Sequence, residues 1–190
     1  MVKSSLDYNQ IRKAIAREIQ KVTGLDNNHV VYLEAEAPNV PRPTNPYMGF
    51  KIISPGERFG DDSKQNIIDP VTGLPTNNWN SGGNRKMTIS FNAYGTSHEE
   101  AYNYMSLWQA ALDLENIQED LRAFGIAVWV IGNVADLSAL LNTGYEGRAQ
   151  MDCSFGIAVN VQSNLGEIDS GAVEGTVNTN QNTQTFTVPT

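Results

Sequence analysis

The sequence has little of the residues that carry chemistry in many other proteins. It holds one cysteine, Cys153, and two histidines, His29 and His98. A single cysteine excludes an internal disulfide framework and a cysteine-based zinc cage. No apolar run approaches the roughly 18–20 residues that a bilayer-spanning helix needs. Residues 1–7 also lack the apolar stretch of a secretion signal. We therefore expect a soluble, cytosolic product with no membrane partner.

Positive charge is scarce as well. The chain has 13 Lys and Arg against 21 Asp and Glu, which gives a net charge of −8. No basic residue follows Arg148, so the C-terminal end carries acids only. Non-specific nucleic-acid binding depends on Lys and Arg that neutralise phosphates. The composition therefore argues against a protein that binds DNA or RNA in this way.

Catalytic and cofactor motifs are missing too. The chain has no Gly-rich phosphate cradle, because neither GxGxxG nor GxxxxGK[ST] occurs. Residues 98–102 begin like the metal-binding HExxH pattern but end in Tyr102, and no GxSxG motif is present. We predict no catalytic residue, no cofactor and no metal, and hence a protein that is not an enzyme.

One acidic cluster leaves an alternative of another class open. Glu57, Asp61, Asp62 and Asp69 lie close together in the sequence, and a hard cation such as calcium prefers several such oxygens. Their spacing does not fit an EF-hand loop. A solvated loop is the simpler interpretation. The alternative is a small metal-dependent hydrolase or ligand-binding module that uses Asp61, Asp62 and Asp69.

Hydrophobic periodicity predicts the body of the fold. Hydrophobic residues make up 40% of the chain, which suffices for a real core. Ile11, Ile15, Ile19 and Val22 lie on one face of a helix expected over 6–23, with Asp7 as its N-cap. Further helices are expected over 97–112, where Ser97 and Glu100 have capping-box spacing, and over 117–124.

Strands are expected between and after these helices. Short strands fit 29–33 and 47–53, and residues 85–94 and 149–161 alternate apolar with polar residues, which is typical of strands with one buried face. The continuous apolar run 126–131 reads as a strand buried on both faces, and 136–141 as a short helical turn or loop. The order predicts an α+β domain: a mainly antiparallel sheet with helices packed on one face.

Two polar segments fall outside this body. Residues 54–84 read as a long loop insertion, with a small hairpin at 67–74 and an isolated Trp79 that either anchors an interface or packs back onto the body. Residues 164–190 read as a flexible polar arm, whose β-prone end holds Phe186 and Val188. These two residues are candidates to add a strand to the sheet edge of a neighbour. The predicted domains are 1–163 and the arm 164–190.

A resemblance emerges near the end of the domain. Residues 136–141, DLSALL, and 145–155, YEGRAQMDCSF, resemble the pattern D-L-S-x-L-L … E-x-R-A-x-x-D-x-x-F of phage neck and tail-terminator proteins. The order of helices and strands over roughly 6–162 is also similar to that family. Glu146, Arg148 and Asp152 fall on the pattern, and we expect Glu146 and Arg148 to form an ion pair that orients the loop.

The resemblance implies a structural virion protein of the tail or neck, assembled in the host cytoplasm. Its partners would be copies of itself in a ring, commonly a hexamer, the tail tube protein and the head-completion proteins, with the tail sheath as a further candidate. Such a ring caps the tail tube, and DNA passes through it without sequence-specific binding. The alternative within the same machine is a head–tail connector or a tail tube subunit.

Overall fold

The fold is a long sheet with helices on one side. The computed structural model describes residues 3–4, 7–33, 42–141, 144–164, 173–179 and 182–188. The helices are α1 (Tyr8–Thr23), α2 (His98–Ala111) and α3 (Glu115–Arg122). The strands are β1 (Lys3–Ser4), β2 (Val30–Tyr32), β3 (Tyr47–Ile68), β4 (Pro75–Gly95), β5 (Ile126–Val130), β6 (Ala135–Asp136), β7 (Ala139–Leu141), β8 (Gly144–Asn164), β9 (Val173–Thr179) and β10 (Asn182–Val188).

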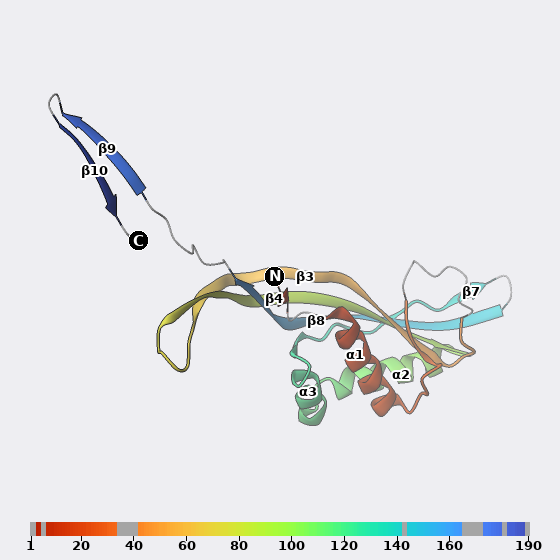
Figure 1. The fold of residues 1–190 in the computed structure, drawn as a ribbon. Helices are drawn as coiled ribbons and strands as arrows, with labels where there is room; N and C mark the ends of the chain where they lie inside the picture. The colour runs from red at the N-terminus through yellow and green to blue at the C-terminus, as the bar shows by residue number, and fades with distance from the viewer. Residues whose placement is uncertain are drawn as a thin grey trace.

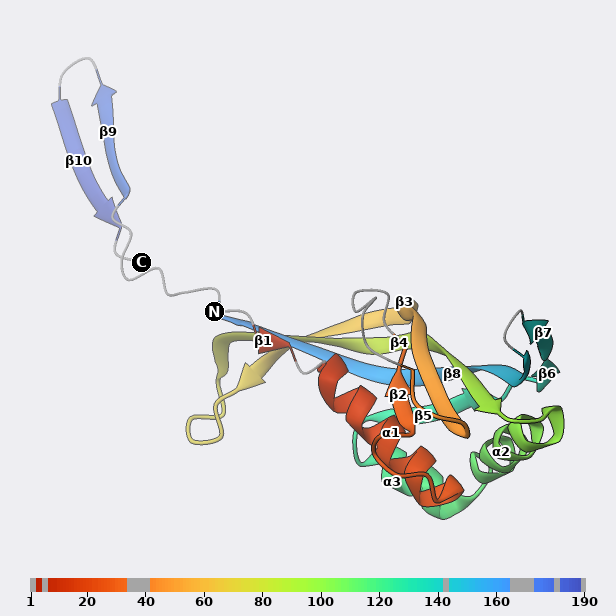
Figure 2. The same ribbon diagram turned by 90° about the vertical axis from the view of Figure 1, so that its right-hand side faces the viewer.

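Three long strands form the centre of the sheet. Within the described residues, the strand order is β1-β8-β4-β3-β2. β4 occupies one edge of β8, and β5, β6 and β7 pair with β8 along its other edge, as β1 does. All these pairings are antiparallel except that of β2 with β3. All three helices lie on one face of the sheet (Figure 1, Figure 2). The predicted α+β architecture is therefore confirmed.

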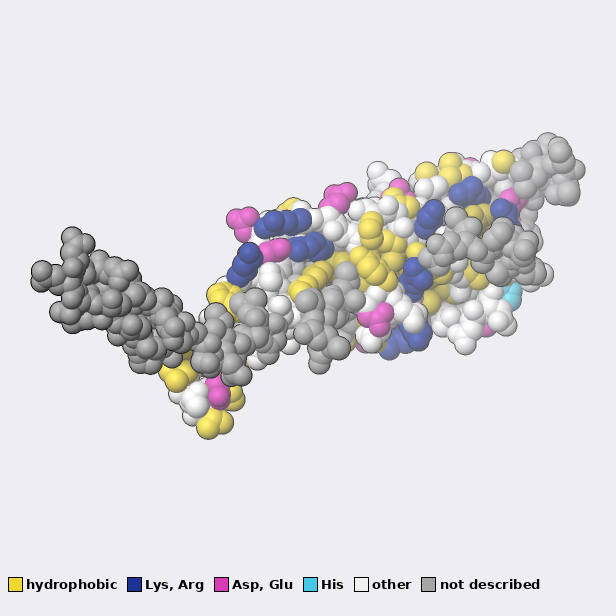
Figure 3. All heavy atoms as spheres, turned by 45° about the horizontal axis from the view of Figure 1, so that its top comes forward, with side chains coloured by type: hydrophobic (Ala, Val, Ile, Leu, Met, Phe, Trp, Pro, Cys, Tyr) yellow, Lys and Arg dark blue, Asp and Glu magenta, His cyan; other side chains and the backbone are white. Residues whose placement is uncertain are grey.

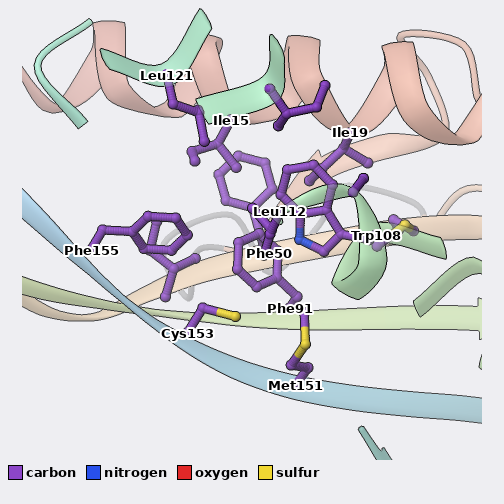
Figure 4. Close-up of a cluster of buried hydrophobic side chains, with 14 of the residues drawn as sticks. Ile15, Ile19, Phe50, Phe91, Trp108, Leu112, Leu121, Met151, Cys153 and Phe155 are labelled. Atoms are coloured by element: carbon purple, nitrogen blue, oxygen red, sulfur yellow. The ribbon is translucent and has the colours of Figure 1, made fainter. Parts of the chain in front are cut away.

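The core lies between the helices and the sheet. The alternating residues of β4 and β8 supply its floor, and α1, α2 and α3 cover it (Figure 4). Phe91 on β4 stands at its centre, with ring centroids 5.5 Å from Trp108, 6.3 Å from Phe50 and 6.2 Å from Phe155. Cys153 lies on the same face, 1% exposed, and burial raises the pKa of its thiol to about 11.

Local signals in the sequence fix where the helices begin and end. The Asp7 carboxylate accepts hydrogen bonds from the backbone N–H groups of Asn9 and Gln10, and Gly24 ends α1 in a left-handed conformation. At α2, Ser97 Oγ accepts from the Glu100 N–H at 3.2 Å. The Glu100 carboxylate, however, reaches back to Thr96 instead of Ser97, with both contacts at 2.8 Å.

Residues 54–84, expected to be a loop, form strands instead. They are the outer halves of β3 and β4, which stay paired from Ser54 with Thr88 to Ile68 with Pro75, with several register shifts. The predicted hairpin at 67–74 exists as the turn of this longer hairpin. Both faces of the outer halves meet solvent, so their residues do not alternate between apolar and polar. The sequence therefore lacked the usual strand signal.

Three other segments also differ from expectation. Residues 136–141 contain no helical turn, because β6 and β7 pair there with β8. β5 is not buried on both faces, since Trp129 is 38% exposed and Val130 is 58% exposed. The C-terminal segment holds β9 and β10, which pair with each other as a separate two-stranded sheet. Within the described residues, no helix has the length and apolarity to span a membrane.

Two phenylalanines provide a matched test of this core. Phe91→Ala removes a fully buried ring and leaves a cavity, which should lower the free energy of unfolding by about 3–5 kcal/mol. Phe59→Ala removes a ring that is 59% exposed, and we expect a loss of about 1 kcal/mol or less. Urea denaturation of dilute protein measures both. Equal losses would contradict the assignment of the core.

Candidate subunit interface

The outer halves of β3 and β4 form an arm that extends beyond the helices. We call residues 54–84 the distal hairpin (Figure 1). Arg85 fixes its base, because its guanidinium forms a two-pronged ion pair with the Asp62 carboxylate at 2.7 and 2.9 Å. This pair lowers the pKa of Asp62. β8 lies along the other side of β4 as far as Asn164, so the hairpin is part of a three-stranded ribbon.

Exposed apolar side chains gather at the tip of the distal hairpin. Ile68 is 52% exposed, Val71 90% and Leu74 65%. Asp69 shapes the turn between them, since its carboxylate accepts hydrogen bonds from the backbone N–H groups of Val71 and Thr72. A turn fixed in this way holds its hydrophobic side chains in water. Exposed apolar side chains that cluster often mark a protein interface.

Trp79 lies on β4 below this tip. Its side chain is 38% exposed, and its backbone pairs with Asn66 of β3 and Ser163 of β8. The indole therefore keeps part of its surface open instead of joining the core. Its role as an interface anchor remains a prediction.

The three carboxylates of the metal hypothesis each have another setting. Asp62 holds Arg85, and Asp69 caps the turn at the tip. Asp61 projects fully into solvent, with its nearest cation, Arg58, at 3.9 Å. Among the residues that the structure describes, no group of three His, Cys, Asp or Glu side chains is placed to hold a metal ion.

The sheet face opposite the helices carries a second apolar surface. We call Ile53, Phe59, Trp129 and Val130 the open-face patch; their exposed fractions are 52%, 59%, 38% and 58%. The ring of Trp129 lies over Gly156 of β8 and meets the ring of Phe59 edge-on, with centroids 4.9 Å apart. Figure 3 shows hydrophobic side chains in the middle of this face, with charged side chains beside them toward the distal hairpin.

Gly156 makes this aromatic contact possible. A Cβ atom at this position would lie 2.2 Å from the indole ring of Trp129. The glycine therefore lets the indole lie flat across β8. From there it contacts Phe59 of β3 on the same face of the sheet. Sequence reasoning missed this patch, because the apolar run of β5 resembles that of a buried strand. Its two distinct faces appear only once β5 is placed at the edge of β8.

The other predicted interface residues, Phe186 and Val188, lie on β10. Their backbones pair with Gly175 and Val173 of β9. Strand addition to the sheet edge of a neighbour remains a prediction for these two residues.

The residues of the family-like segment are placed differently from expectation. Glu146 and Arg148 do not pair with each other. Arg148 donates two hydrogen bonds to Asn92 Oδ1, at 2.8 and 3.2 Å, and its guanidinium lies 5.5 Å from the centre of the Tyr94 ring. Glu146 instead faces Arg42 at 3.6 Å. The pairing of β4 with β8 places Arg148 opposite Tyr94. Its guanidinium therefore contacts Asn92 and Tyr94 of β4 instead of Glu146.

Fold and surfaces together define a class: an α+β protein whose distinctive features are open apolar surfaces. Comparison with known families agrees with this, because residues 9–182 match the model of the phage neck terminator protein family. The chain belongs to that family, and this membership gives it a structural role in the neck of a phage virion. Among curated proteins, no sequence matches the chain.

The ion pair at the base of the distal hairpin generates a test with neighbouring residues. Asp62→Asn removes the partner of Arg85 and should increase amide hydrogen exchange in the outer halves of β3 and β4. Asp61→Asn changes the same charge at a solvated position and should leave exchange unchanged. Because the native pKa of Asp62 is lowered, its contribution is present above the unfolded value near 4 and is lost as pH falls further. Equal effects of the two variants would contradict the role of Asp62.

Proposed function

We propose that this chain is the subunit of a ring, six copies as the family resemblance implies, that caps the tail tube and joins it to the head-completion proteins. The observation that carries the proposal is the family match, which spans residues 9–182. Residues 1–163 form the ring-building domain and 164–190 its arm. The direct partners are further copies of the chain, the tail tube protein and the neck proteins, with the sheath as a further contact in a contractile tail.

The geometry supports assembly through unlike surfaces. A closed ring of identical subunits needs heterologous contacts, in which one patch meets a different patch on the next copy. This chain has two such patches: a protruding tip with Val71 and Leu74, and a flat sheet face with Phe59 and Trp129. In the proposed ring, the tip and Trp79 contact the neighbouring subunit.

The charge of the chain supports the passage of DNA. With a net charge of −8, a ring of these subunits repels the phosphate backbone and offers it few cationic contacts. DNA then crosses the lumen without sequence-specific binding. A reconstruction of the assembled ring with a basic inner wall would contradict this part of the proposal.

Electron microscopy of purified tails tests the capping role directly. Tails from a phage that lacks the gene should be longer than normal and unjoined to heads. Adding the purified protein should place a ring at the tube end nearest the head. Tails of normal length in the deletion, or no binding to tube ends, would refute the proposed role. Complete absence of tails would instead indicate a tube subunit.

The tip of the distal hairpin should be necessary for ring formation. Val71→Asp with Leu74→Asp places two charges in a contact that we expect to exclude water, and should shift the mass of the assembled species toward monomer, as measured by native mass spectrometry. Leu137→Asp is the control, because Leu137 is 43% exposed and lies between β6 and β7, at the other end of the sheet (Figure 2). Unchanged assembly of the double variant would rule out the tip as an interface.

A further inference from the structure

We propose that the β9–β10 hairpin of one subunit docks on the open-face patch of a neighbouring subunit. The inference rests on the proposed ring and adds a specific contact to it. Among the described residues, the β9–β10 hairpin pairs only with itself, and no helix covers the open-face patch (Figure 1).

The register of β9 with β10 divides the residues of the hairpin between two faces. Directly paired residues share a face, and the pairs Val173 with Val188 and Gly175 with Phe186 alternate with Glu174–Thr187 and Thr176–Thr185. By this register the apolar residues Val173, Val177, Phe186 and Val188 share one face of the hairpin with Thr179, Asn182 and Gln184, whereas the other face holds polar residues only. A two-stranded hairpin alone is marginally stable in water, so an apolar face of this kind calls for a partner.

The second half is the open-face patch. Phe59 and Trp129 form an aromatic contact that no helix of the described residues covers, and on the same face Ile53 and Val130 are more than half exposed. A flat, partly aromatic sheet face of this kind suits the apolar face of another sheet, because stacked sheets pack face to face at about 10 Å. The hairpin has the right shape and chemistry for this.

Charge distribution favours the same pairing. No basic residue follows Arg148, and the segment that carries β9 and β10 has only the acids Glu167, Asp169 and Glu174. Lys51 and Lys86 pair with Ser90 and Glu57 across β3 and β4, which puts both lysines on the face of the patch. Neither lysine forms an ion pair with a described residue. In the docked arrangement, these two lysines can lie beside the edge of the hairpin and attract the acidic residues of the arm.

Chain length favours a neighbour as the source of the hairpin. β8 ends at Asn164, whereas Gly156, beneath Trp129, lies about 26 Å back along the strand. The nine steps from Asn164 to Val173 span at most about 32 Å when fully extended. The apolar pairs lie at the base of the hairpin, next to this linker, so docking on the same chain would need a taut linker that also reverses its direction.

Quenching of Trp129 fluorescence by acrylamide tests the contact in the full-length chain. A Trp79→Phe background leaves Trp108, which is fully buried, and Trp129, which is 38% exposed, so Trp129 dominates the quenching. We expect quenching to fall several-fold when the chain assembles, and to return in Phe186→Asp. Thr185→Asp, next in sequence but on the polar face, is the matched control and should stay protected.

A mixing experiment identifies the source of the hairpin. One chain carries Phe186→Asp with an intact patch; the other carries an intact hairpin with Trp129→Phe and Val130→Asp, so only the first chain reports. A neighbouring hairpin should protect Trp129 once the two are mixed. Phe59→Asp replaces Val130→Asp if the latter does not fold.

The outcomes separate this inference from the proposed function. If rings form but Trp129 stays fully quenchable, the docking is overturned and the proposed ring is not. The same holds if Phe186→Asp and Thr185→Asp behave alike. If Trp129 is already protected in the dilute monomer and gains no protection on mixing, the hairpin docks on its own chain. That result overturns the proposal that a neighbouring subunit supplies it. A chain that assembles neither alone nor on tails overturns both proposals.

Discussion

The continuous pairing of β4 with β8 is the constraint on which the rest of the structure depends. The two strands stay in one antiparallel register, without a shift, from Gly95 with Gly147 to Asn78 with Asn164. Because side chains alternate along a strand, this single register decides which residues enter the core and which face solvent. A slip by one residue would set the apolar faces of the two strands on opposite sides of the sheet, so that either Phe91 or Phe155 would turn to the open face and the floor of the core would be lost.

The same pairing carries the chain beyond its own core. Near Phe91 the ribbon of β3, β4 and β8 is covered by helices, whereas toward its tip Ile68, Val71 and Leu74 are exposed. The strands themselves continue because their backbone hydrogen bonds remain satisfied, and Asp62 with Arg85 holds the ribbon together where packing ends. A molecule built in this way keeps a stable body on one side and presents extended surfaces on the other.

The sequence was a good guide wherever burial imposes a period. α1, with Asp7 and Gly24 at its ends, and the alternating strands β4 and β8 could be predicted because one face of each is buried. The distal hairpin could not, since its residues meet solvent on both faces and carry no alternation. The apolar run of β5 was misleading, because Trp129 and Val130 are apolar without being buried. Proximity in the sequence predicted an ion pair between Glu146 and Arg148. In the structure Glu146 faces Arg42, and Arg148 donates to Asn92.

The central claim is that this protein acts through the surfaces that its own helices leave open. Hydrogen–deuterium exchange, compared between the dispersed chain and the same chain assembled at tail ends, tests that claim most directly. The account predicts that assembly slows exchange in the distal hairpin, in β5 around Trp129 and in β9–β10, while the solvent-facing side of α2 and α3 stays unchanged. Slower exchange confined to α2 and α3, with the open face unaffected, would contradict it.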